Sequence, residues 1–443
     1  MSPGARPARI VLTTFGSLGD LHPYLAIGLA LAARGHRVTL ATHEGYRRRI
    51  EREGLSFHPV PPDLADFGDQ ATLMRRLMDQ RTGSEAVVRT LVLPFVRASY
   101  DALEVACAGA DLLVTHPITY AAHVLAERKA QELRWASAVL QPMIFFSAYD
   151  PPVLPQAPWF ARLRPLGPAF HRVVFGLGRA MTRPWMKPVD DLRRSVGLSP
   201  ATEHPMFEGA VSPALHLALF SSVLARPQPD WPEQTVVTGF PVYDRDEDGR
   251  GMPPELLRFL EAGPAPIVFT LGSSAVMDAG SFFRVSVEAA ERLARRAVLL
   301  VGREKPDLPE RLPEGMLAVP YAPHSELMPR AATIVHQGGV GTTAQALASG
   351  RPMLVMPYSH DQQDHAARIE RLGVGRAIAR GFYRTERVVR ELGRLLEDSE
   401  VARRAASVSA RVRAEDGART AADELEALLD RGGVGVGGAT LLR

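Results

Sequence analysis

Short runs of apolar residues alternate with helical patterns along most of this sequence, and that alternation limits the fold more than any other feature. Residues 10–14 (Ile-Val-Leu-Thr-Thr) form the first run, and apolar residues then recur at helical spacing from Leu21 to Ala32. Gly35 ends this pattern, and residues 37–41 form the next run. A strand, a helix and a second strand in this order predict a right-handed crossover in a parallel sheet. Further strands are predicted at residues 111–115, 136–140 and 215–220.

A second series of the same kind occupies the later part of the chain. Between the two series lie residues 242–264, an acidic stretch rich in Gly and Pro that is typical of an interdomain linker. The length of 443 residues also exceeds the roughly 100–200 residues of one ordinary domain. We therefore predict an α/β protein with two doubly wound, Rossmann-like domains that face each other across a cleft. The strands predicted in the second series are residues 266–271, 297–301, 317–319, 333–336 and 352–356.

The domain boundaries are predicted from this division. The first domain is expected over residues 1–241, the linker over 242–264 and the second domain over 265–410. Residues 411–443 are expected to form a C-terminal helix that crosses back to the first domain, followed by a Gly-rich tail. Ligands of doubly wound sheets bind at the carboxyl ends of the strands, so the cleft between the domains is the expected site.

Composition and charge exclude several classes of protein. The chain is 46% hydrophobic and 23% charged, which excludes a largely disordered protein. A net charge of +3 gives no strong field that would favour nucleic acid. The single cysteine, Cys107, allows no intramolecular disulfide, and no signal-peptide core precedes residue 10, so a cytoplasmic location is expected. The longest apolar run, residues 214–225, is shorter than the roughly 20 residues of a membrane span.

The densest motif is a glycine-rich turn between a predicted strand and a predicted helix, at residues 335–343 (Val-His-Gln-Gly-Gly-Val-Gly-Thr-Thr). Free backbone N–H groups and the positive end of the helix dipole meet at such a turn, and the glycines let an anion approach closely. Thr342 and Thr343 can add hydroxyl donors to phosphate oxygens. The alternative without a binding function is a tight turn in which Thr342 is the helix N-cap.

The same glycines fit a second interpretation. The run Gly339–Ala344 matches the G-x-G-x-x-A dinucleotide fingerprint, and Asp361 lies near the expected position of a ribose-binding acid. Such a site would make the protein an NAD(P)-dependent or flavin oxidoreductase. That fingerprint usually opens its domain, whereas several predicted strand–helix units precede it here, and Asp361 lies beyond its strand in a loop. These two points favour a diphosphate site of another class.

The segment from Tyr321 to Gln362 resembles the donor-binding signature of the family 1 nucleotide-sugar glycosyltransferases, which have the two-domain GT-B fold. The resemblance implies that Tyr321–His324 stacks on the base and that His336–Thr343 binds the diphosphate. It further implies that Asp361-Gln362 holds sugar hydroxyls and that Gly272-Ser273 contacts phosphate. The implied donor-binding residues are Ser273, Tyr321, His324, His336, Gln337, Gly338, Gly339, Gly341, Thr342, Thr343, Asp361 and Gln362.

The chain departs from this signature at two positions. Many members have His directly before the first glycine, where this chain has Gln337, and their ribose-binding Glu aligns with Gln345. The resemblance covers residues 10–428 and is strongest in the C-terminal half. It implies a UDP- or dTDP-sugar as co-substrate and no bound cofactor.

The turn Gly16–Asp20 (Gly-Ser-Leu-Gly-Asp) resembles the G-S-x-G-D turn of a subgroup with sterol glucosyltransferases, antibiotic glycosyltransferases and the rhamnosyltransferase of rhamnolipid synthesis. An inverting transferase needs a base for the proton of the acceptor, and Asp20 occupies the position of the catalytic His of other members. His22 is the alternative base because imidazole titrates nearer neutral pH, and a helix N-cap is the alternative role of Asp20. The acid that pairs with the catalytic His elsewhere has no clear match, but His116 lies in that region and is a candidate for the pocket.

Residues 141–200 are rich in Pro and large apolar side chains, with Arg residues interspersed. In GT-B enzymes this region often shapes the acceptor pocket, so an apolar acceptor with a hydroxyl group is expected, with Phe145 and Phe146 in the pocket. The alternatives are a packed core with loops, or a weak contact with membrane lipid.

Other functions and partners are considered beside glycosyl transfer. A sugar-nucleotide epimerase or hydrolase of the same fold would need no apolar pocket, and a degenerate transferase could act as a non-catalytic helper. Residues 244–248 contain an Asp-x-Asp pattern that holds a metal in other transferases, but their Gly-rich setting favours a solvated loop. The His residues show no metal-ligand spacing, so no metal site is predicted. A monomer or a homodimer is expected.

Overall fold

The computed structural model describes residues 7–245, 251–302 and 307–431. The glycine-rich tail expected after residue 431 and the acidic residues 246–248 of the expected linker lie outside these ranges. No helix within the described ranges is both long and apolar enough to cross a membrane.

The first domain contains a seven-stranded parallel sheet with the order β3-β2-β1-β4-β5-β6-β7. The chain first adds strands on one side of β1 and then returns to its other side with β4, as in a doubly wound sheet. The strands are β1 (Arg9–Thr13), β2 (Arg37–Thr42), β3 (Ser56–Pro59), β4 (Leu112–Thr115), β5 (Arg134–Val139), β6 (His216–Ala218) and β7 (Thr235–Val237).

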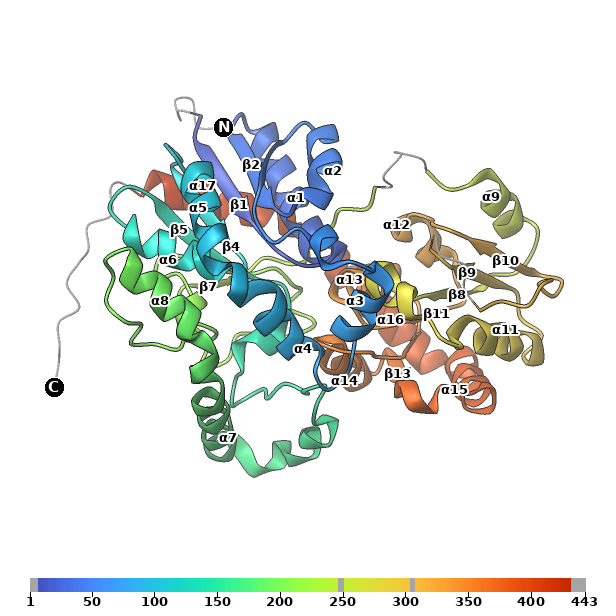
Figure 1. The fold of residues 1–443 in the computed structure, drawn as a ribbon. Helices are drawn as coiled ribbons and strands as arrows, with labels where there is room; N and C mark the ends of the chain where they lie inside the picture. The colour runs from blue at the N-terminus through green and yellow to red at the C-terminus, as the bar shows by residue number, and fades with distance from the viewer. Residues whose placement is uncertain (1–6, 246–250, 303–306, 432–443) are drawn as a thin grey trace.

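The second domain contains a six-stranded parallel sheet with the order β10-β9-β8-β11-β12-β13. Figure 1 shows the two sheets as separate bodies, with α13 and α14 between them in this view. The prediction of two doubly wound α/β domains is confirmed. The strands are β8 (Ile267–Thr270), β9 (Ala297–Leu300), β10 (Met316–Val319), β11 (Thr333–His336), β12 (Met353–Val355) and β13 (Gly375–Ala377).

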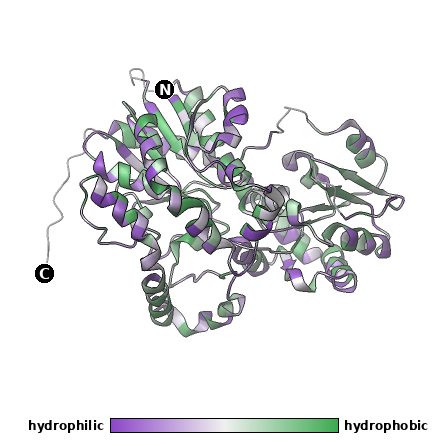
Figure 2. Cartoon of the chain, viewed as in Figure 1, coloured by the Kyte–Doolittle hydropathy of each residue, from purple (hydrophilic) through white to green (hydrophobic). Residues whose placement is uncertain are grey.

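The edge strands β3, β7 and β13 were not predicted. Each has only three or four residues, and their side chains are mostly half-buried or exposed. Such strands lack the continuous apolar run that marks the central strands of a parallel sheet. The central strands do show that run, and in Figure 2 the strands are predominantly hydrophobic.

Helices cover both faces of the first sheet. One face packs on α1 and on α17, the last helix of the chain, through Leu21, Leu25 and Leu425. The other face packs on α5, α6 and α8. The helices of this domain are α1 (Leu18–Ala33), α2 (Arg47–Arg52), α3 (Gln70–Leu77), α4 (Gly83–Ala86), α5 (Val96–Ala106), α6 (Tyr120–Arg128), α7 (Gly167–Thr182) and α8 (Lys187–Ser195).

The later helices include one inside the expected linker. This helix, α9, packs Leu256 into the core of the second domain. The helix α17 follows the second domain in sequence but joins the first domain, where Glu426 pairs with Arg34 at 2.6 Å. These helices are α9 (Pro254–Glu261), α10 (Gly272–Ala275), α11 (Phe282–Arg292), α12 (His324–Leu327), α13 (Val340–Ser349), α14 (Gln362–Leu372), α15 (Thr385–Glu397), α16 (Ser399–Arg413) and α17 (Gly417–Asp430).

A buried arginine connects the two domains. Arg368 of α14 donates through Nε to Asp364 at 2.6 Å and through Nη1 to Asp150 of the first domain at 2.5 Å. The other oxygen of Asp364 accepts from the Val153 N–H at 3.0 Å. The same guanidinium also reaches the Leu224 carbonyl at 3.3 Å. These contacts fix the orientation of α14 relative to the first domain.

We expect Arg368→Met to lower the free energy of unfolding by about 3–5 kcal/mol, because it leaves the buried Asp364 without its cation and Asp150 with only the more exposed Arg164 and Arg371. The matched control is Arg371→Met, since Arg371 lies 3.4 Å from the same Asp150 but keeps 39% of its side chain exposed. The control should cost no more than about 1 kcal/mol. Urea denaturation followed by tryptophan fluorescence measures both. If both variants lost the same free energy of unfolding, the buried Arg368 would contribute no more than the exposed Arg371, which would contradict this account.

Candidate functional site

Asp20 lies in the first turn of α1, directly after β1. Ser17 is the N-cap, and its N–H and hydroxyl donate to Asp20 Oδ2 at 2.7 and 3.1 Å. Asp20 therefore occupies the third helical position (N3) of a capping box whose N-cap is Ser17. This corrects the alternative in which Asp20 itself is the N-cap. Gly16 has φ +136°, and a Cβ there would lie 2.3 Å from Asp20 Oδ2, so glycine leaves the room that the carboxylate occupies.

The second oxygen of Asp20 faces His116, which follows β4. Asp20 Oδ1 and His116 Nε2 are 3.5 Å apart. His116 Nδ1 accepts from the Ile118 N–H at 3.5 Å, which favours the tautomer with its hydrogen on Nε2, toward the carboxylate. Asp20 keeps 26% of its side chain exposed while His116 is buried. The fold thus brings together two candidate residues that the sequence placed far apart.

His22 lies two residues after Asp20 in α1, but its ring faces Tyr243 and Arg49. Its ring contacts Tyr243 at 5.0 Å, and its Nε2 is 3.3 Å from Arg49 Nη1. Burial and the Arg49 charge lower the pKa of His22 to about 3. The imidazole is therefore neutral near pH 7, with its Nε2 directed at a cation.

The glycine turn lies at the start of α13. Gly338 has φ +89°, and a Cβ there would lie 2.9 Å from Val355 Cγ1. Gly339 is the N-cap of α13, so Thr342 lies at the third helical position, which corrects the alternative that made Thr342 the N-cap. Thr343 Oγ1 is buried without a hydrogen-bonding partner. A Cβ on Gly341 would meet no atom within 4 Å. The helix start therefore presents free N–H groups to an open space.

Gln337 links this turn to the one after β8. Its Nε2 donates to Thr342 Oγ1 at 3.4 Å, while its Oε1 is buried without a partner. Gly272 has φ +64°, and a Cβ there would lie 2.3 Å from Gln337 Nε2. The turn that carries Ser273 thus lies directly against the glycine turn. The two segments expected to bind phosphate, one after β8 and one after β11, are therefore adjacent.

His336 supports the glycine turn from inside. Its Nδ1 accepts from the Gly338 N–H at 3.1 Å, and its Nε2 is buried without a partner. Burial, followed by the neighbouring His324 and His365, lowers the pKa of His336 to about 3. A neutral imidazole that accepts at Nδ1 must carry its hydrogen on Nε2. Burial lowers the pKa of His324 as well.

Asp244 holds the segment expected to stack on the base. It accepts from the Tyr321 hydroxyl at 3.2 Å and from the Ser325 N–H at 2.6 Å. The prediction of a solvated loop is therefore wrong for Asp244, because both of its oxygens bond to the second domain. Within the described residues, no three His, Cys, Asp or Glu side chains are grouped as a metal ion would require.

The segment before α14 brings the second domain to Asp20. Asp361 Oδ2 lies 3.3 Å from His365 Nδ1, which is also 2.8 Å from the Gly338 carbonyl. Burial raises the pKa of Asp361, and the nearby Asp20 charge adds to the shift, whereas His365 and His360 oppose it. Asp20 and Asp361 therefore lie close enough to interact although they belong to different domains. Gln362 is buried, and its Oε1 accepts from the Tyr358 N–H at 2.8 Å.

His360 and His365 are site residues that the sequence analysis did not select. His360 has φ +56°, and its Nδ1 lies 3.0 Å from the Ser84 hydroxyl of the first domain. Burial lowers the pKa of His360, and Asp361 and Asp20 oppose that shift. Their positions in the sequence could have indicated them. His360 directly precedes the Asp361-Gln362 pair, and His365 follows Asp361 by four residues, the spacing of neighbours on one helix face.

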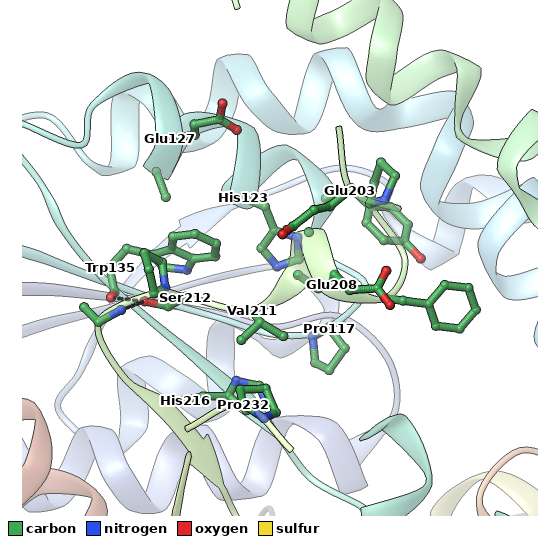
Figure 3. A pocket seen from close by; sticks show the side chains of 18 of the residues that line it. Pro117, His123, Glu127, Trp135, Glu203, Glu208, Val211, Ser212, His216 and Pro232 are labelled. Carbon is green, nitrogen blue, oxygen red and sulfur yellow. Dashed lines mark hydrogen bonds between the residues drawn. The ribbon is translucent and has the colours of Figure 1, made fainter. Parts of the chain in front are cut away.

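The two acceptor candidates contact different aromatic clusters. Phe145 stacks on Trp231 with ring centroids 3.8 Å apart, whereas Phe146 packs edge-on against Phe175 and Phe207. Phe145 also lines a cavity of about 1110 Å³ between α6 and residues 201–216, which Figure 3 shows with His123 and His216. The residues around this cavity include neither Asp20 nor the glycine turn, so we place the chemistry elsewhere.

A smaller cavity of about 30 Å³, room for about one water molecule, is lined by residues of the segments that carry Asp20 and His116. Phe15 on one wall precedes the Gly16–Asp20 turn, and Ile118 and Thr119 on another follow His116. Most other lining side chains are apolar, and sequence reasoning did not select them because they belong to segments without a motif. They include Val60, Pro61, Pro62, Val92, Val96 and Leu103.

Two family models match separate parts of the chain. Residues 10–125 match the model described as "Glycosyltransferase family 28 N-terminal domain". Residues 286–429 match "Erythromycin biosynthesis protein CIII-like, C-terminal domain". The first match contains Asp20 and His116, and the second contains the glycine turn and Asp361.

Named relatives match along nearly the whole chain. O-mycaminosyltylonolide 6-deoxyallosyltransferase of Streptomyces fradiae is 33% identical over 422 residues, or 93% of this chain and 96% of the relative. A sterol 3-beta-glucosyltransferase of Yarrowia lipolytica is 28% identical over 95% of this chain, which spans only 29% of that protein.

Solved structures share the fold at lower identity. The calicheamicin glycosyltransferase CalG4 has a TM-score of 0.70 and 18% identity, covering 96% of this chain and 99% of its own. The glycosyltransferase VinC in complex with dTDP has a TM-score of 0.68 and 20% identity, covering 96% of this chain and all of its own.

The open space at Gly341 gives a test of the anion site. We expect Gly341→Ala to leave the melting temperature of the free protein unchanged or raised, because Ala favours helices by up to about 1 kcal/mol. The thermal stabilisation by UDP or dTDP should nevertheless be lost, because the methyl group occupies the space expected for the diphosphate.

The matched control for this variant is Gly176→Ala. Gly176 is also helical, and a Cβ there would likewise meet no atom within 4 Å. This variant should keep the full stabilisation by nucleoside diphosphate in the same thermal-shift assay. If UDP or dTDP raised the melting temperature of Gly341→Ala as much as that of the wild type, the diphosphate would not bind at this helix start.

Proposed function

Since this chain belongs to the family of nucleotide-sugar-dependent GT-B glycosyltransferases that includes O-mycaminosyltylonolide 6-deoxyallosyltransferase, we propose that it is an inverting transferase. It moves a sugar from a dTDP- or UDP-sugar to a hydroxyl of an apolar natural product or sterol. The observation that carries this proposal is the Asp20–His116 pair, because its turn lies near the start of α13: a Cβ on Gly19 would lie 3.8 Å from Val340 Cγ1.

Asp20 is the general base in this proposal. Oδ2 is held by two donors of Ser17, so the carboxylate keeps one orientation, and Oδ1 takes the proton of the acceptor hydroxyl as its oxygen attacks the anomeric carbon. His116 Nε2 lies 3.5 Å from Oδ1 and is proposed to position it. The resemblance implies that other family members carry a His at the position of Asp20, and His116 lies in the region of the acid that pairs with that His. The low pKa of His22 and its contact with Arg49 argue against the alternative base.

The start of α13 stabilises the leaving diphosphate. Its free N–H groups and the positive end of the helix dipole face the open space beside Gly341. The Thr343 hydroxyl can add a donor, and Ser273 lies on the adjoining turn. This arrangement supplies positive potential where negative charge develops, so the proposal includes no cofactor and no metal.

Asp361 and Gln362 bind the sugar. The Asp20 charge contributes to the raised pKa of Asp361, and we propose that the sugar lies between the base and the diphosphate. The named relative transfers a 6-deoxyallosyl group and VinC holds dTDP, which favours a dTDP-linked deoxyhexose as donor. An oxidoreductase that uses Gly339–Ala344 is not favoured, because the matching family models and relatives are glycosyltransferases.

The acceptor is proposed to bind with its hydroxyl at Asp20 and its apolar body against side chains of the segments that carry Asp20 and His116. Phe15 and Ile118 give an apolar surface within these segments, and Val96 lines the same small cavity. Relatives with a macrolide and with a sterol in their names point to rigid polycyclic or macrocyclic alcohols. A sugar-nucleotide epimerase or hydrolase would not need this apolar surface.

Replacing the base tests the mechanism. Asp20→Asn should lower kcat by about 10²–10⁴-fold, because Asn keeps the shape and the capping acceptor but cannot take a proton. The thermal stabilisation by dTDP should remain. The rate is measured as release of dTDP or UDP in the presence of a macrolide aglycone or a sterol.

His22→Asn is the control for that experiment. It should change kcat by less than about tenfold, equivalent to 1.4 kcal/mol. If His22→Asn abolished turnover while Asp20→Asn kept it, His22 would be the base and the proposed role of Asp20 would be wrong.

A further inference from the structure

One segment of the first domain exposes large apolar side chains. Among the described residues, nine large hydrophobic side chains are strongly exposed, and six of them lie between residues 149 and 181. This segment contains the helix α7 and the turn before it, which project from the body of the domain (Figure 1). The six side chains are Tyr149, Trp159, Leu166, Val173, Leu177 and Met181.

Three of these side chains form a stripe along α7. Val173, Leu177 and Met181 follow one another at four-residue spacing, so they lie on one face of the helix. Their exposures are 74%, 62% and 68%, and we call them the outward stripe. Figure 2 shows hydrophobic residues along this projecting helix.

The opposite face of α7 anchors the helix to the domain. His171 and Phe175 are buried there and pack against Phe160. Phe175 also contacts Phe146, the acceptor candidate of the first domain. The core of the domain therefore fixes the helix, and the outward stripe does not serve its folding.

The cations around the outward stripe outnumber the acids that pair with them, although Arg164 pairs with Asp150, just before this segment. Residues 151–189 contain no Asp or Glu, and their six cationic residues are Arg162, Arg164, Arg172, Arg179, Arg183 and Lys187. Arg179, Arg183 and Lys187 pair with acids that follow this segment, while Arg172 donates to the Tyr149 hydroxyl. The exposed segment thus combines apolar side chains with cations, as interfacial helices do.

We propose that the outward stripe and the surrounding cations form a docking surface for an anionic lipid bilayer. The stripe enters the boundary between headgroups and acyl chains, and the cations bind the anionic headgroups. A second copy of the chain fits less well, because a two-fold interface would bring the same basic segment against itself. This docking does not depend on the proposed glycosyl transfer.

The docking surface also lies beside the acceptor side of the first domain. The contact between Phe146 and Phe175 joins α7 to residues 141–146, which the sequence resemblance assigns to the acceptor side, although Phe145 lines a cavity away from Asp20. A bilayer bound at α7 would bring this side of the domain close to apolar alcohols dissolved in the membrane. Docking would then raise the local concentration of such acceptors.

Flotation with lipid vesicles tests the proposal. The full chain is mixed with vesicles of phosphatidylglycerol and phosphatidylcholine in equal parts, or of phosphatidylcholine alone. We expect the wild type to bind the anionic vesicles about tenfold more strongly than the neutral ones, with this difference reduced in high salt. The triple variant Val173→Glu, Leu177→Glu, Met181→Glu should bind the anionic vesicles at least about tenfold less than the wild type.

Val105→Glu is the charge-matched control for the single variant Leu177→Glu, and it places its Glu at a side chain of α5 that is 66% exposed. It should bind the anionic vesicles as the wild type does. The melting temperature and the stabilisation by dTDP show that the triple variant remains folded. The proposal is overturned if the wild type does not float with anionic vesicles, or if the triple variant floats equally. A dimer in light scattering that only the triple variant dissociates would instead assign the surface to a second copy.

Discussion

The buried Arg368 guanidinium determines how the two domains face each other. It joins Asp364 of α14 to Asp150 of the first domain, and Asp364 also accepts from the Val153 N–H. The segment just before α14 carries Asp361, so the same contacts position this residue relative to the first domain. Contacts of Ser84 with His360 and of Ser359 with the Asp79 carbonyl add to this alignment. The site therefore depends on a connection that lies outside it.

The two domains contribute different parts of the proposed chemistry. The first domain holds a carboxylate that is oriented by Ser17 and His116 and is still partly exposed, as a base for an incoming alcohol must be. The second domain holds a helix start with free N–H groups and open space, as a leaving diphosphate requires. The two buried histidines of the second domain, His336 and His365, orient the glycine turn through their contacts with Gly338. Their role is to position the backbone.

The sequence predicted the two sheets, the glycine turn and the family, because each depends on local patterns. The runs at β1 and β11 are continuous and mostly apolar, and the turn after β11 carries its glycines and threonines within one short segment. The edge strands β3, β7 and β13 could not be predicted, because their pairing depends on neighbours that are distant in sequence. The approach of His116 to Asp20 is also a product of strand order, since β1 and β4 are adjacent in the sheet but separated by two strands in the chain. The linker was only partly predicted, because Asp244 bonds to the second domain and α9 packs into its core.

The most direct test of the central claim is the anomeric configuration of the product. The purified chain is supplied with UDP- and dTDP-α-hexoses and a macrolide aglycone or a sterol, and the glycoside is analysed by proton NMR. One displacement by an alcohol that Asp20 deprotonates inverts the anomeric centre, so the account predicts a β-glycoside and stoichiometric release of nucleoside diphosphate. An α-glycoside would contradict it, because retention needs a second displacement or a front-face reaction for which Asp20 is not the base.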